Sequence, residues 1–188
     1  MSLPICPTTC TATPPTVDFS LCNPVVNNGQ IAKIYFTTIG NPLVNWASEI
    51  EWDSRLDNDA AGAANIRTLI VVGDKPVPAK TEKEISLGRK ISGVKQFTVA
   101  FDIDETNQTN YDAMRQIECG GNFLVWYETR DGLLYGSTAG IEAKLSIDET
   151  IPRAYADLIL FPGTLTWESK FHPERITSPI TDETGDQF

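Results

Sequence analysis

The chain has few of the residues that catalysis requires. Its 188 residues include a single histidine, His172. A Ser–His–Asp set needs a histidine as its base, but His172 precedes Pro173 near the C-terminal end, where we expect an exposed loop histidine. The segment 136–140 does not match a nucleophile elbow because its serine follows the first glycine directly, so we expect a loop there. Phosphate-loop, dinucleotide and zinc-helix motifs are also missing. We therefore predict no enzyme, no catalytic residue and no cofactor.

Cysteine is also scarce, with four residues at Cys6, Cys10, Cys22 and Cys119. The spacing of Cys6 and Cys10 is not that of a zinc knuckle, and no second close pair exists. A zinc site built from these cysteines, or from three of them with His172, stays open as an alternative. Two disulfides would need an oxidising exterior. We expect free thiols and no bound metal.

Acidic residues outnumber basic ones, 25 to 15, which gives a net charge of −10. Such a chain is poorly suited to binding phosphate backbones. The acidity either keeps the protein soluble or forms a negative wall that repels DNA in a channel. No apolar run approaches the length of a membrane span, and the N-terminus lacks signal-peptide features. We expect a protein that is kept or assembled in a cytoplasm, with no membrane partner.

Two acidic clusters could suggest a calcium site or a glycosidase. An EF-hand loop needs glycine at its sixth position and glutamate at its twelfth, and the segment from Asp102 has Asn107 and Ala113 there. The segment from Asp57 has Gly62 at the sixth position but Ala61 at the fifth and Thr68 at the twelfth, so it fails as well. A pair of carboxylates for glycoside hydrolysis would meet only in space, so a small hydrolase stays open as a third hypothesis. The alternation of the sequence places Asp102 and Asp104 on the solvent face of a strand.

Composition divides the chain into three parts. Residues 1–29 form a proline-rich extended arm that wraps its own domain or lies on a neighbour. Residues 30–170 form a single β-rich domain, and residues 171–188 form a C-terminal tail. Alternating or β-branched segments predict strands at 30–39, 46–56, 66–72, 80–87, 96–104, 123–135, 141–147 and 155–167.

Several of these segments carry finer expectations. Residues 66–72 are apolar enough for burial on both faces, and residues 80–87 suit an edge strand. Residues 131–132, Asp-Gly, suit a two-residue hairpin turn. The four tryptophans, Trp46, Trp52, Trp126 and Trp167, lie in apolar strand contexts, so we expect core or interface residues rather than a sugar platform.

One helix is expected, at residues 107–118. Tyr111, Met114 and Ile117 share one face, Thr109 or Asn110 could cap the start, and the glycine pair 120–121 stops the helix. Tight turns favour antiparallel neighbours. The predicted fold is mainly β: an antiparallel β-sandwich or partly closed barrel with one flanking α-helix.

The order of elements resembles the tail tube proteins of tailed bacteriophages. The resemblance lies in the segments from Ile85 to Asp104, Asn107 to Glu118 and Phe123 to Trp167, while the N-terminal arm has no match in it. It implies a virion subunit, assembled in the host cytoplasm, that forms rings with copies of itself and meets other virion proteins. Strands would line an acidic channel through which DNA passes without specific binding, and the helix would lie outside.

The leading hypothesis is thus a non-enzymatic virion structural subunit, most specifically a tail tube or tail ring protein. Subunits would assemble by strand augmentation and by docking of the arm. The strand face with Gln96, Thr98, Asp102 and Asp104 would suit an acidic lumen. The alternative is a monomeric β-sandwich module that binds glycan or a host surface through exposed aromatics: Tyr127, Tyr135 or Trp167.

Overall fold

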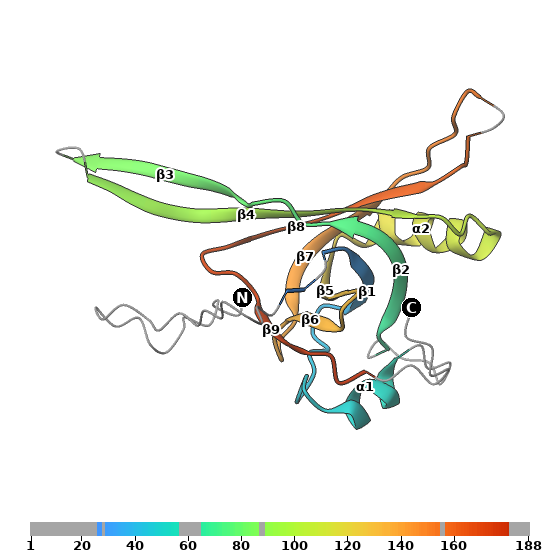
Figure 1. Cartoon of the computed structure of the whole chain (residues 1–188), viewed down its shortest axis with the longest axis horizontal. Coiled ribbons are helices and arrows are strands. Elements are labelled where there is room, and N and C mark those ends of the chain that lie inside the picture. The colour runs from blue at the N-terminus through green and yellow to red at the C-terminus, as the bar shows by residue number, and fades with distance from the viewer. Residues whose placement is uncertain (1–25, 28, 57–64, 87–88, 155–156, 181–188) are drawn as a thin grey trace.

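Six antiparallel strands close into a barrel (Figure 1). The computed structural model describes residues 26–27, 29–56, 65–86, 89–154 and 157–180. Around the barrel the strands follow the order β1 (Ile31–Thr38), β2 (Arg67–Asp74), β4 (Arg89–Ile103), β8 (Phe161–Ser169), β7 (Ile141–Ile147) and β5 (Asn122–Thr129). Closure comes from pairing of β5 with β1. The mainly β prediction is confirmed, with a barrel that is fully closed.

The inward side chains of strands with strict alternation fill the barrel interior. The inward residues of β4, from Phe97 to Ile103, are buried, and the outward residues between them are exposed or half-buried. β7 repeats the pattern with Ile141, Ala143, Leu145 and Ile147, as predicted. The Phe97 and Trp167 rings stack at 5.0 Å between centroids. Burial of each such side chain contributes about 1.5–3 kcal/mol.

The helix α1 (Glu49–Arg55) lies where a strand was predicted, so the strand prediction for residues 46–56 is wrong. Its Glu51 carboxylate accepts hydrogen bonds from the backbone N–H groups of Val44 and Asn45, both at 2.6 Å. Trp52 is fully buried while Ile50 is exposed, which breaks the expected alternation. Trp52 packs on Tyr35 and Trp126, so α1 covers the outer face of β1 and β5.

The second helix, α2 (Gln108–Gly120), was predicted. Its buried Met114 and Ile117 join the core cluster of Ile147 and Phe161, so α2 packs against the barrel end where β7 finishes and β8 begins. The cap is Asn107 rather than Thr109 or Asn110, because its side chain accepts the backbone N–H of Asn110. The helix stops at Gly120–Gly121, as expected. No helix in the described ranges is long and apolar enough to cross a membrane.

Strand β2 is buried on one face only, contrary to prediction. Val71 is buried, whereas Ile70 and Val72 point outward and are more than half exposed. These β-branched residues have the composition of a doubly buried strand, but no described element covers that side of the barrel.

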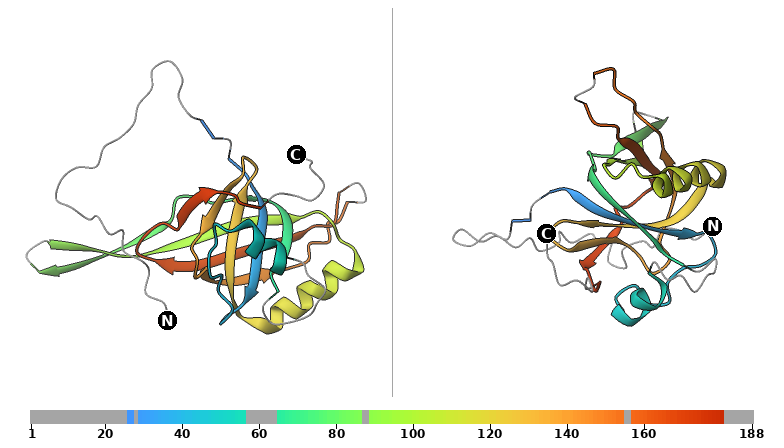
Figure 2. Two further views of the ribbon diagram at one scale, coloured as in Figure 1. Left: turned by 90° about the horizontal axis from the view of Figure 1, so that it is seen from below. Right: turned by 90° about the vertical axis from the view of Figure 1, so that its right-hand side faces the viewer.

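A long hairpin projects from the barrel (Figures 1 and 2). Strand β3 (Ala79–Ser86) pairs with the first half of β4 and, among the described strands, with nothing else. The edge-strand prediction is therefore confirmed for residues 80–86, and residue 87 lies outside the described residues. Strand β4 begins at Arg89, earlier than predicted, because this half of it belongs to the hairpin and the second half to the barrel.

The remaining turns and strand bounds differ from those predicted from the sequence. The turn from β5 to β6 (Leu133–Gly136) has three residues, 130–132, with Gly132 at φ +71°, so the two-residue turn is wrong. Strand β8 begins at Phe161, not at residue 155. An unforeseen strand, β9 (Glu174–Thr177), lies in the segment expected as a tail and pairs with β6. The arm up to residue 25 and residues 181–188 lie outside the described residues.

Candidate functional site

One broad face of the barrel carries no helix. It consists of the outward residues of β2, β4, β8 and β7, on the opposite side of the barrel wall from the core cluster. Five exposed carboxylates and one lysine mark this surface, which we call the acidic sheet face: Asp74, Asp102, Glu142, Asp148, Glu168 and Lys144. Threonines fill much of the space between them. The predicted solvent exposure of Asp102 and Asp104 is confirmed.

Strand register brings the carboxylates of this face together from distant parts of the chain. In the β2–β4 ladder, Asp74 lies opposite Ala100 and Val72 lies opposite Asp102. In the β4–β8 ladder, Asp102 lies opposite Pro162. Asp148 comes beside them at the end of β7, where its N–H donates to the carbonyl of Pro162 at 2.9 Å. The three aspartates line a shallow hollow of about 280 Å³. Within the described ranges, no three His, Cys, Asp or Glu side chains are grouped closely enough to hold a metal ion.

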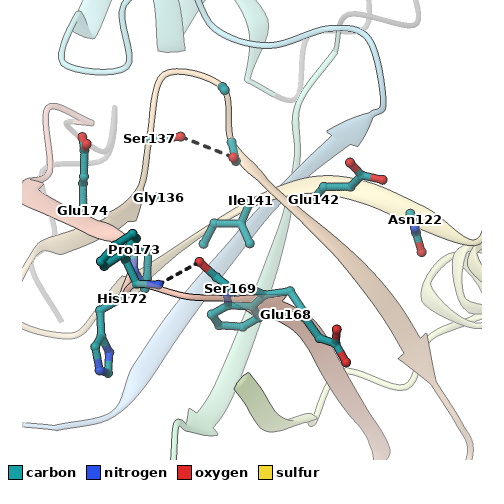
Figure 3. Close-up of a pocket in the computed structure, with 14 residues that line it drawn as sticks. Asn122, Gly136, Ser137, Ile141, Glu142, Glu168, Ser169, His172, Pro173 and Glu174 are labelled. Carbon is teal, nitrogen blue, oxygen red and sulfur yellow. Dashed lines mark hydrogen bonds between the residues drawn. The ribbon is translucent and has the colours of Figure 1, made fainter. Parts of the chain in front are cut away.

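A second hollow, of about 380 Å³, lies at the other end of the face, between the β6–β7 and β8–β9 connections. Glu142, Glu168, Glu174 and His172 line it (Figure 3). Figure 3 shows the three glutamates spread around the hollow rather than converging on one point. Each hollow is therefore lined by several carboxylates, and Glu142 and Glu168 belong both to the second hollow and to the acidic sheet face.

His172 is exposed, as predicted, and its ring meets the Phe97 ring edge-on at 5.2 Å. Desolvation at this position lowers the pKa of His172 below its usual 6.5, and the charges of Lys95, Lys75 and Lys80 lower it further. The residue is thus the neighbour of a lysine cluster at the base of the hairpin. No serine or carboxylate is hydrogen-bonded to it among the described contacts.

The expected aromatic binding residues do not form a surface. Tyr127 and Trp167 are buried in the barrel core, so the exposure that the binding-module alternative assumes for them is wrong, while the expected core position of Trp167 is confirmed. Tyr135 is half-buried and stacked on Tyr127 at 4.9 Å. Trp46 and Trp52 are buried as well, together with Trp126, which confirms the expectation that the tryptophans belong to the core.

The structure also shows where the 136–140 segment and one of the four cysteines lie. Gly136 ends β6 and residues 137–140 form the loop to β7, in which the carbonyl of Ser137 accepts the indole N–H of Trp126 at 2.7 Å. Cys119 is an exposed free thiol on α2. Cys6, Cys10 and Cys22, like Asp57 and Asp59, lie outside the described residues.

The acidic sheet face could be only partly inferred from sequence. Alternation within one strand predicts that Asp102 faces solvent. Only the order of the strands around the barrel brings the other carboxylates to the same face: Asp74, Glu142, Asp148 and Glu168. Exposed carboxylates in this density repel polyanions. No protein-family model, curated protein or solved structure matches this chain.

Proposed function

We propose that this chain is a non-enzymatic structural subunit that assembles with copies of itself into rings, most specifically as a tail tube or related tail protein of a tailed bacteriophage virion. The observation that carries the proposal is the acidic sheet face, a wide surface with five carboxylates next to a projecting hairpin, on which Ile70 and Val72 of β2 are the exposed large aliphatic residues. A monomer gains nothing evident from such a combination, whereas a ring subunit needs both a lumen surface and a reaching element.

Open strand edges supply a mode of assembly. Among the described strands, β3 pairs only with β4 and β9 pairs only with β6, so each leaves one edge with unpaired backbone groups. Natural proteins protect such edges or pair them with another chain. Edge pairing that continues around a closed ring leaves no open edge.

The acidic sheet face would serve as the lumen wall. Its five carboxylates and single lysine give a negative surface, and its threonines keep it wettable. DNA would pass such a wall without adhering, because like charges repel at short range even in salt. No observation favours the alternative of a glycan-binding module, since two of its three aromatic residues are buried.

Negative-stain microscopy with light scattering of the full chain tests the assembly. We expect rings or tubes with a mass many times that of one chain. A monomer at every concentration would contradict the proposal. Removal of residues 1–29 is expected to weaken assembly, and normal assembly of the truncated chain would show that the arm is not needed.

The lumen role has a separate test in charge reversal. Asp102→Lys with Glu168→Lys should leave assembly intact and make the particles retain double-stranded DNA in a gel-shift assay. The control is Asp112→Lys with Glu118→Lys, which makes the same charge change on exposed positions of α2. Equal DNA retention by both variants would show that net charge, rather than this face, decides the effect.

A further inference from the structure

Charge is distributed very unevenly along the chain. Residues 75–96, which span the hairpin, contain six basic and two acidic residues, whereas the rest of the chain has nine basic and 23 acidic ones. The hairpin segment therefore carries +4 and the remainder −14. This contrast gives the molecule one positive projection on a negative body.

Three of the six basic residues, Lys75, Lys80 and Lys95, lie where the hairpin leaves the barrel, and the other three lie further out along β3 and β4. Lys80 and Lys95 lie directly opposite each other in the β3–β4 ladder, an arrangement of like charges that destabilises a strand pair. Lys75 lies over the Phe97 ring at 5.6 Å, and His172 meets the same ring. No carboxylate of the described residues forms an ion pair with any of these four side chains.

An exposed apolar residue accompanies these cations. Val77, in the link between β2 and β3, is 88% exposed. We call this group the hairpin root: Lys75, Val77, Lys80, Lys95 and His172. Its mixture of cations and apolar surface suits a protein partner with carboxylates and exposed aliphatic side chains better than it suits phosphate alone.

A surface with the complementary character lies at the opposite end of the same molecule. The β7–β8 connection exposes two acids and three large aliphatic residues, which we call the loop patch: Glu149, Ile151, Asp157, Leu158 and Ile159. Two backbone hydrogen bonds between Thr150 and Leu160 hold the base of this connection together. Arg153 is the basic residue described within it.

The root and the patch of one chain cannot meet. The hairpin and the β7–β8 connection point away from each other at the two ends of the long β4–β8 pair in Figure 1 and again in the left view of Figure 2. Contact between the two surfaces therefore requires a second molecule. A contact between two different surfaces of identical chains is head-to-tail, and it produces a ring or a filament.

We propose that the hairpin root of one copy docks on the loop patch of a second copy of this chain. This inference rests on the proposed self-assembly and assigns its contact surfaces. Carboxylates of the patch would offset the Lys80–Lys95 repulsion, and the aliphatic side chains of the patch would cover Val77. Opposite charges would also orient the encounter and exclude the root-to-root pairing.

Reciprocal charge swaps test the contact in the full chain. Lys80→Glu with Lys95→Glu makes the root negative, and Glu149→Lys with Asp157→Lys makes the patch positive. Each variant alone then opposes like charges at every contact, so we expect its half-assembly concentration, measured by light scattering, to rise more than about tenfold. An equal mixture pairs each changed surface with a complementary one and should assemble again near the wild-type concentration.

A control variant, Arg115→Glu with Arg130→Glu, makes the same charge change as the root variant at exposed positions of α2 and of the β5–β6 turn and should assemble like wild type. If wild type assembles and the swapped variants do too, or if their mixture fails to recover, the docking inference is overturned while the proposed function stands. A wild-type chain that never assembles overturns both. A wild-type chain that instead retains double-stranded DNA, and loses it with the root variant, assigns the root to nucleic acid and also overturns the inference.

Discussion

The hydroxyl of Tyr35 donates a hydrogen bond to the carboxyl group of Glu128 at 2.5 Å, between two buried residues that lie 93 positions apart in the chain. Both belong to the outer layer where β1 and β5 pair and close the barrel. A buried carboxyl group without a hydrogen-bond partner loses the solvation that it would have in the unfolded chain. The pair therefore contributes to the stability of the closed barrel.

Tyr35→Phe is expected to lower the free energy of unfolding by about 1–3 kcal/mol, because it leaves the buried Glu128 without this donor. Urea denaturation measures the change. Tyr111→Phe is the control, since Tyr111 is only half-buried and its hydroxyl has no hydrogen bond among the described contacts. Equal costs for the two substitutions would contradict the importance of the Tyr35–Glu128 pair.

Gly163→Ala should destabilise the barrel by about 1–3 kcal/mol or more, as overpacking does in well-filled cores. A Cβ atom at Gly163 would lie 2.3 Å from Cζ of Phe101, on the neighbouring strand. Thermal unfolding followed by circular dichroism measures the effect. Gly29→Ala adds a methyl group with nothing within 4 Å and should change little. A Gly163→Ala protein as stable as wild type would mean that the Phe101 ring can move aside freely.

Lys80→Glu should change two measurements in opposite directions. It turns the Lys80–Lys95 pair into an attractive one, so the isolated chain should gain up to about 1 kcal/mol of stability in urea. The same change removes a positive charge from the hairpin root, so assembly should weaken. A variant that loses both stability and assembly would indicate misfolding of the hairpin instead.

The imidazole of His172 should titrate below its usual pKa of 6.5. Because folding lowers the pKa, the unfolded chain binds the proton first as the pH falls. Stability from this residue is therefore complete above about pH 6.5 and declines as the pH falls through 6.5 toward the lower pKa of the folded state. His172 is the one histidine in the sequence, so its NMR signals identify it directly.

The neighbours of His172 decide the size of that effect. Lys75, Lys80 and Lys95 face it from the hairpin side, and Glu168 and Glu174 line the same hollow. Lys95→Met should raise the pKa of His172 toward 6.5, whereas Lys144→Met, on the acidic sheet face, should leave it unchanged. A titration at or above 6.5 in wild type would rule out the lysine cluster as its environment.

Elements whose hydrophobic pattern is local could be predicted from the sequence. Phe97 to Ile103 and Ile141 to Ile147 alternate without interruption, and this period fits only a strand with one buried face. Helix α2 was equally well specified, because Met114 and Ile117 fall on one helical face and two glycines follow. Asp102 on the solvent face follows from the same alternation.

Features that depend on residues far apart in the chain follow only from the tertiary contacts. The spacing of Trp46, Ile50 and Trp52 is compatible with either a strand or a helix. The contacts of Trp52 with Tyr35 and Trp126 stabilise the helix. Ile70 and Val72 have the composition of core residues, yet no described element covers them. The β1–β5 closure, the acidic sheet face and the hairpin root all join residues far apart in the chain. The residue pattern within one strand does not predict which other strand it pairs with. The free energy of strand pairing depends on the whole set of strands and not on any one of them.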